Sequence, residues 1–134
     1  MSELSMNLRG TVVHGDKRGR VLGFPTANIN SEVPGLAYGV YASEIVFDGD
    51  DRVWPSVTSY GTRPTFAGAD QKIETHILDF QGDIYGREVE VRLLAFIRPE
   101  LRFSSVENLV ATMQDDVKQV RALSRAAQQR GDDK

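Results

Sequence analysis

The chain has 134 residues, enough for one domain with a real core but short of the size at which a second core is expected. Its net charge of −3, hydrophobic share of 40% and charged share of 26% are ordinary, and they argue against a basic surface for nucleic acid. Zero cysteines exclude disulfides and thiolate metal sites, and the two histidines are scattered. No apolar run approaches the roughly 18 residues that span a bilayer, and the N-terminus lacks a signal-peptide core. We therefore expect a cytoplasmic monomer whose partners are neither nucleic acids nor membranes.

The first two thirds of the chain alternate β-rich runs with turn residues, a pattern typical of an all-β sandwich or barrel. Five runs have strand character: 8–15, 38–47, 52–61, 72–80 and 87–97. An Asp-Gly pair after the second run signals a hairpin, and Pro55 restricts part of the third run to an edge or a bulge. In the fifth run, alternating apolar and charged residues predict one buried and one wet face, and residues 94–97 predict a far end covered on both sides.

The last third of the chain has a helical period. Apolar residues recur at helical spacing at Val106, Leu109, Val110, Met113, Val117, Val120 and Leu123. Ser104 followed by Glu107 is a capping-box signature, which predicts a helix from about Ser105 to Ala126. Its apolar stripe must pack against the barrel. The polar tail 127–134 is expected to fray, so the interpretation is a single domain, 1–134, with a core of about residues 8–126.

Residues 19–30, GRVLGFPTANIN, form the first candidate site. Pro25 favours extended backbone at the residue before it, and in an extended segment Thr26 and Asn28 project on the same side. A hydroxyl and an amide carbonyl suit a nucleotide-bound Mg²⁺, which prefers oxygen ligands and keeps waters or phosphate oxygens. Upstream residues would cradle and neutralise an anion: Gly15, Gly19, Lys17, Arg18 and Arg20. The alternative is a solvated turn with a basic tip.

A carboxylate in the fourth run is the second candidate. Strand alternation places Glu74 and His76 on one face with Leu78 and Phe80. Burial on that face would tune Glu74 toward general-base work on a hydroxyl. The alternative is that the face is buried only at its Phe80 end and that Glu74 lies at a wet rim, with His76 a satisfied core histidine.

Two loops could supply a rim for a ligand. Arg98 at the end of the fifth run and Phe103 before the helix offer a cation and an aromatic plane, which suits a flat ligand. The alternative is a loop arginine beside a core phenylalanine. Residues 60–66, YGTRPTF, form another rigid loop that could act as a flap. The phosphate loop of P-loop proteins and the Gly-x-Gly-x-x-Gly fingerprint are both missing from the sequence.

The order of these motifs carries a resemblance. GxVVxGxxxGRxLGFPTANI, then GVYA, GTRPTF, ETHILDF, YG, RPExxF and DD resemble, in sequence and spacing, the riboflavin kinase (flavokinase) family, including the kinase module of bacterial bifunctional riboflavin kinase/FAD synthetases. The resemblance covers about Leu8 to Leu123. It implies a mainly β fold, a six-stranded antiparallel Greek-key barrel with a long C-terminal α-helix. It also implies transfer of the γ-phosphoryl group of ATP to the ribityl 5′-hydroxyl of riboflavin, giving FMN and ADP, with Mg²⁺.

The resemblance implies a role for each matching position. Thr26 and Asn28 fall where the family holds Mg²⁺ and the nucleotide phosphates, and Glu74 falls where it places the base that accepts the hydroxyl proton. The phosphate-covering loop matches Gly15 and Arg20, the adenine side matches Ile84, Tyr85 and Gly86, and the flavin side matches Arg98, Phe103, Glu107 and Asp116.

Three hypotheses of function follow from the sequence. An ATP- and Mg²⁺-dependent riboflavin kinase leads, with FMN as the expected end product because the matching stretch holds no adenylyltransferase module. A catalytically weak regulatory module that binds flavin or nucleotide is the alternative, although Thr26, Asn28 and Glu74 argue against it. An oligonucleotide-binding barrel is weakened by the acidic charge and by the lack of an evident stacking platform. Ser59 and Tyr60 depart from the Asn and Ile more common in bacterial relatives, which bears on flap packing or flavin affinity.

Overall fold

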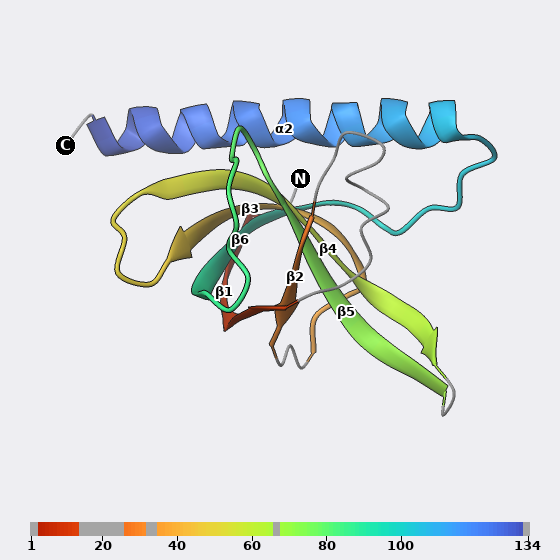
Figure 1. The fold of residues 1–134 in the computed structure, drawn as a ribbon. Helices are drawn as coiled ribbons and strands as arrows, with labels where there is room; N and C mark the ends of the chain where they lie inside the picture. Colours follow the sequence, from red (N-terminus) through yellow and green to blue (C-terminus); the bar gives the residue numbers. More distant parts are fainter. Residues whose placement is uncertain (1–2, 14–25, 32–34, 66–67, 133–134) are drawn as a thin grey trace.

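A computed structural model describes residues 3–13, 26–31, 35–65 and 68–132. They form a closed six-stranded antiparallel barrel with one long helix lying across it (Figure 1). The strands are β1 (Glu3–Val13), β2 (Ala27–Asn30), β3 (Gly39–Phe47), β4 (Val53–Thr65), β5 (Gly68–Ile77) and β6 (Glu88–Arg98), and the helix is α2 (Val106–Asp132). The predicted fold, a six-stranded antiparallel barrel with a C-terminal helix, is confirmed.

The strand order around the barrel is β1-β2-β5-β4-β3-β6, and β6 closes the ring by pairing with β1. Strand β2 was not among the five strands that the sequence pattern predicted. Its first three residues are all buried, so they show no alternation of apolar and polar side chains. Within the described part of the chain, no helix has the length and apolar character that crossing a membrane requires.

The barrel interior is filled by alternate side chains of every strand. Its apolar core combines aliphatic and aromatic residues, among them Leu8, Val12, Ile29, Tyr41, Ile45, Phe47, Tyr60, Ile73, Val89, Val91 and Leu93. The alternation of β6 therefore follows the predicted pattern, with its valines inside and its charged residues outside.

Four buried hydroxyl side chains cross the middle of this interior, and we call them the hydroxyl chain: Ser43, Ser56, Thr58 and Thr75. Ser43 Oγ lies 2.7 Å from Ser56 Oγ and 2.7 Å from Thr58 Oγ1, and Thr58 Oγ1 lies 2.9 Å from Thr75 Oγ1. Each hydroxyl thus has a partner from the same set, which avoids the cost of an unsatisfied polar group in a core.

Helix α2 packs on the outside of the barrel over β3, β4 and β6. Val120 is fully buried and packs with Ala42, Leu78 and Ala95 in a second apolar cluster. A bulge in β6 lets that strand serve both clusters, because the register with β3 shifts between Ala42 and Ser43. This shift explains why the far end of β6 is covered on both faces.

The helix differs from its predicted bounds at both ends. The cap is Ser105, whose Oγ accepts a hydrogen bond of 3.1 Å from the backbone N–H of Asn108, so the predicted capping box from Ser104 to Glu107 is one residue out of place. Ser104 Oγ instead accepts a bond from the Asn108 side chain. At the other end α2 continues to Asp132, so most of the tail predicted to fray is helical.

Several strand ends also differ from the prediction. Strand β1 begins at Glu3, and β4 and β5 extend as a twisted pair beyond the rest of the barrel (Figure 1). The predicted flap therefore belongs in large part to β4. Pro55 lies just before Ser56, where the pairing of β4 with β5 begins, so its missing N–H falls where β4 has a neighbour on one side only.

Candidate active site

Two adjoining pockets lie beside β2 and β5. The first, of about 1030 Å³, lies between the outer face of β4 and β5, the 98–105 segment and the start of α2. The second, of about 510 Å³, is lined by β1, β2 and β5 residues and by the segment 80–85. Thr26 lines both pockets. A ligand in either pocket therefore meets the same threonine.

The two oxygen-bearing residues of the PTAN stretch lie beside the carboxylate of β5. Asn28 is directly opposite Glu74 in the β2–β5 register, and Glu74 is directly opposite Ser59 in the β5–β4 register. Residues directly opposite in an antiparallel pair have Cβ atoms about 4.5–5.5 Å apart and share one face. Ala27 and Ile29 point into the core, so this shared face is the outer one. The structure thus pairs Asn28 with Glu74 across the strands, and Thr26 and Glu74 both line the first pocket, whereas Asn28 lines neither pocket.

Glu74 has a cationic neighbour that sequence reasoning missed. Lys72 Nζ lies 2.7 Å from Glu74 Oε1, and the two side chains are 23% and 25% exposed. The signal was present in the sequence, because residues two apart on a strand share a face. The pair fixes one carboxylate oxygen and leaves the acid at a half-buried pocket wall with His76.

The predicted apolar company of Glu74 is confirmed for Leu78, which packs outside the barrel under α2, and is wrong for Phe80. Strand β5 ends at Ile77, and Asp79 has a φ of 62°, so the alternation assumed through Phe80 does not continue. Leu78 packs under α2, whereas Phe80 joins the interior core near Phe47 and Trp54. Glu74 therefore lies at the rim of a pocket rather than on a continuous apolar face.

Arg98, Asp116 and Phe103 form the opposite wall of the first pocket. Arg98 Nε and Nη2 donate to the two carboxylate oxygens of Asp116 at 3.0 and 2.8 Å, and the guanidinium carbon lies 5.8 Å from the Phe103 ring centroid. Asp116 is only 3% exposed, so its carboxylate serves Arg98. Glu107 is exposed in the first turn of α2 and is not among the residues that line this pocket.

Glu100 is a further pocket carboxylate, to which the residue pattern gave no role, although it stands in the RPE motif. Burial raises the pKa of the Glu100 carboxyl, the charge of Glu74 raises it further, and Arg98 opposes both effects. Its carboxylate occupies the space beside Gly61 that a side chain would fill. Glu100 thus places a second negative charge on the same pocket as Glu74.

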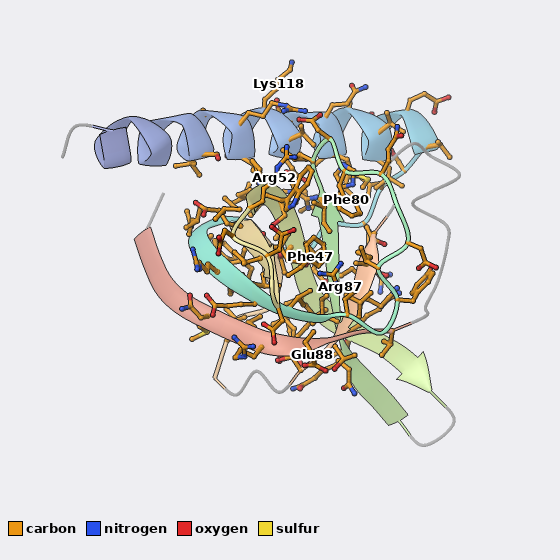
Figure 2. The ribbon with its side chains drawn as sticks, turned by 60° about the vertical axis from the view of Figure 1, so that its left-hand side comes forward. Phe47, Arg52, Phe80, Arg87, Glu88 and Lys118 are labelled. Carbon is orange, nitrogen blue, oxygen red and sulfur yellow. The ribbon has the colours of Figure 1, made fainter. Side chains whose placement is uncertain are left out.

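The second pocket receives two of the three residues predicted for the adenine side. Ile84 and Tyr85 line it, and Gly86, with φ 82°, follows at its edge and donates its N–H to Val12 O at 2.8 Å. At the same end of the barrel, Phe80 packs 5.4 Å from Phe47, and Arg87 lies 5.0 Å above the Phe47 ring (Figure 2).

The five residues predicted to cradle and neutralise an anion lie outside the described residues: Gly15, Lys17, Arg18, Gly19 and Arg20. Among the residues that the structure describes, no group of three or more histidine, cysteine or acidic side chains could hold a metal ion. Neutral oxygens such as those of Thr26 and Asn28 suit a nucleotide-bound cation, with the nucleotide supplying further ligands.

The described residues thus define a closed antiparallel β-barrel protein with two adjoining pockets that share one residue. Residues 2–124 match the family model described as "Flavokinase: Riboflavin kinase". The chain belongs to the riboflavin kinase family.

Relatives of known name are similar in sequence and in structure. The bifunctional riboflavin kinase/FMN adenylyltransferase of Listeria monocytogenes is 45% identical over 120 residues, which cover 85% of this chain and 37% of that protein. The riboflavin kinase of Trypanosoma brucei superposes with a TM-score of 0.70 at 27% identity, covering 96% of this chain and 84% of the other. A Streptococcus pneumoniae chain named as a macrolide-efflux protein superposes with a TM-score of 0.78 at 36% identity, covering 87% and 38%. The chain thus spans little more than a third of the Listeria relative.

Proposed function

We propose that the chain is a riboflavin kinase, which transfers the γ-phosphoryl group of ATP to the ribityl 5′-hydroxyl of riboflavin and releases FMN and ADP. The observation that carries the proposal is the cross-strand pair of Asn28 and Glu74, next to the threonine that both pockets share. Such a junction suits a reaction in which a phosphate from one ligand meets an alcohol from the other. Family membership and the names of the relatives support the same reaction.

In this proposal the first pocket takes riboflavin. It is the larger of the two, and Phe103 offers an aromatic face with Arg98 beside it. The ribityl chain then points toward Glu74, which accepts the hydroxyl proton. Asp116 acts through Arg98, because both of its oxygens bind that guanidinium.

The second pocket takes the adenosine part of ATP, walled by Ile84 and Tyr85. The phosphates extend past Thr26 toward Glu74. The ribityl oxygen bonds to the γ-phosphorus as the bond from that phosphorus to the β,γ-bridging oxygen breaks, the hydroxyl proton passes to Glu74, and ADP leaves. Positioning supplies most of the catalysis in such a transfer, and Glu74 orients the nucleophile.

Mg²⁺ fits the donor set at this junction. A threonine hydroxyl and an asparagine carbonyl are neutral oxygen ligands, and the 9% exposure of Asn28 keeps its side chain beside Glu74. Thr26 and Asn28 would hold the ion together with phosphate oxygens. When bound, it neutralises charge on the triphosphate.

We further propose that the domain acts as a monomer in the cytoplasm, where ATP is available. Light scattering with and without riboflavin, ADP and Mg²⁺ tests the oligomeric state, and a dimer in either condition would contradict the proposal.

Chromatographic detection of FMN tests the proposed reaction. The protein, riboflavin, ATP and Mg²⁺ are incubated together, and we expect FMN to form in amounts equal to ADP. Glu74→Gln keeps the shape of the side chain and removes the base, so the rate should fall by about 100-fold or more while riboflavin still binds. Glu88→Gln is the matched control, because Glu88 is an exposed strand carboxylate that lines neither pocket (Figure 2). Full FMN production by Glu74→Gln would refute the role given to this residue.

A further inference from the structure

One helix supports the walls of both pockets. Asp116 on α2 holds Arg98 in the first pocket. One turn later Val120 packs on Leu78, and the next residue, Arg121, binds Asp79. Figure 1 shows the segment between β5 and β6 rising to α2 at this point before it turns back. The residues that follow Asp79 line the second pocket, and we call residues 80–85 the wall segment.

The contact of Asp79 with Arg121 is bidentate. Arg121 Nη1 donates to Asp79 Oδ2 at 2.9 Å, and Nη2 donates to Oδ1 at 3.0 Å. Bidentate pairs of this type fix orientation as well as distance. The side chain of Arg121 is 40% exposed and that of Asp79 is 68% exposed. The pair therefore adds little to overall stability, and its effect is local.

Asp79 immediately precedes the wall segment, so its contact with Arg121 bears on the position of the residues that line the second pocket. Asp79 is, among the described residues, the one non-glycine with positive φ, and it turns the chain from β5 into the wall segment. Its neighbour Leu78 is buried under α2, and the Leu78 N–H donates to Pro55 O at 2.9 Å. Backbone bonds secure the far end of the wall segment, where Gly86 N–H donates to Val12 O. At the beginning of the wall segment, the side chain of Asp79 makes the charged contact that joins the chain to α2.

We propose that Asp79 and Arg121 are positioning residues that fix where the wall segment leaves the barrel and thereby set the affinity of the second pocket for nucleotide. Neither residue lines a pocket. Both act through Phe80 to Tyr85. The inference rests on the proposed function only in assigning the adenosine part of ATP to this pocket.

Steady-state kinetics and calorimetry with ADP test the inference on four proteins: the parent chain, Arg121→Met, Asp79→Asn and the double variant. Asparagine tolerates the left-handed conformation at position 79, so Asp79→Asn removes the charge without adding backbone strain. We expect each single variant to raise the KM for ATP and the Kd for ADP about two- to fivefold, as an exposed charge pair allows. The KM for riboflavin should not change. The Kd of the double variant for ADP should be no higher than that of the single variant that binds ADP more weakly, because the two residues act as one contact.

Two controls separate positioning from general damage to the fold. Lys118→Met changes a charge on the same helix at a side chain that points away from the barrel (Figure 2). Arg9→Met removes another exposed arginine–aspartate contact, with Nη2 at 2.7 and 3.0 Å from the Asp48 oxygens, from a residue that lines neither pocket. Neither control should alter ADP binding.

The outcomes distinguish this inference from the proposed reaction. If Arg121→Met binds ADP with the affinity of the parent chain, the positioning role is overturned. An equal rise in the KM values for ATP and riboflavin overturns it as well. A parent chain that binds ADP but makes no FMN overturns the proposed function, and the calorimetric comparison still decides whether Asp79 and Arg121 position the wall segment. A parent chain that does not bind ADP overturns both.

Discussion

Replacement of Asp116 by asparagine tests how much the fold depends on the ion pair behind the first pocket. Asp116 is 3% exposed and accepts two hydrogen bonds from Arg98, at 3.0 and 2.8 Å. Asparagine has nearly the same volume, so the change removes charge and one acceptor without opening a cavity. Arg98 then keeps a positive charge at a half-buried site without its counter-ion.

The size of the effect follows from burial. Breaking a fully buried pair by losing one partner costs about 3–5 kcal/mol. Arg98 retains 17% of its side-chain exposure at the pocket, and that contact with water reduces the penalty. We therefore expect the free energy of unfolding to fall by about 2 kcal/mol, which corresponds to roughly 6–10 °C in Tm for a domain of this size.

Urea unfolding followed by circular dichroism measures this change. Asp115→Asn is the matched control, because Asp115 is the exposed neighbour on the same helix, and we expect its stability to match that of the parent. Riboflavin binding by Asp116→Asn should weaken as well, since Arg98 loses its fixed orientation over Phe103. A loss of stability no larger than that of Asp115→Asn would refute the inference that the pair supports the pocket wall.

Three further changes have defined outcomes. Ser105→Ala removes the N-cap bond to Asn108 and should lower stability by about 1 kcal/mol, whereas Ser104→Ala should cost less; equal losses in thermal unfolding would place the cap elsewhere. Burial raises the pKa of Glu100 in the folded chain, so folding favours the protonated carboxyl. The parent chain should therefore lose stability relative to Glu100→Gln as the pH rises from below the ordinary glutamate pKa to above the raised pKa of the folded chain. A difference in the free energy of unfolding that does not change with pH would contradict this. Chelation of Mg²⁺ with EDTA should stop FMN formation and added Mg²⁺ should restore it, and FMN formation at full rate in EDTA would exclude the metal from the proposed reaction.

The sequence predicted well those elements in which apolar residues recur at one constant spacing, either that of a strand or that of a helix. Strand β6 alternates cleanly, and α2 carries an apolar stripe at helical spacing, so both bounds of β6 and the start of α2 were placed within one residue. Strand β2 was not resolved because its four residues are too few to show a period and three of them are buried. The extension of α2 beyond Ala126 was missed because polar residues carry no periodic signal.

The resemblance implied that the Thr26–Asn28 segment and Glu74 serve one site, but the residue pattern alone did not show how the elements bring them together. The proximity of Asn28 to Glu74 depends on the β2–β5 pairing, which joins strands far apart in the sequence. The pairing of Arg98 with Asp116 depends on where α2 crosses the barrel, so two residues assigned separately to the flavin side proved to be one unit. Phe80 was misplaced because an aspartate at φ 62° interrupts the alternation that a strand pattern assumes.

The hydroxyl chain inside the barrel constrains how this sequence can diverge. Each of its hydroxyls is the hydrogen-bonding partner of another, and Thr58 joins Ser43 to Thr75. An apolar replacement of Ser43 removes the partner hydroxyl of Ser56, and one of Thr58 removes that of Thr75, whereas replacing Ser43 together with Ser56, or Thr58 together with Thr75, avoids that cost. Substitutions among these four positions should accordingly be inherited in pairs, so the centre of the barrel should diverge through correlated steps.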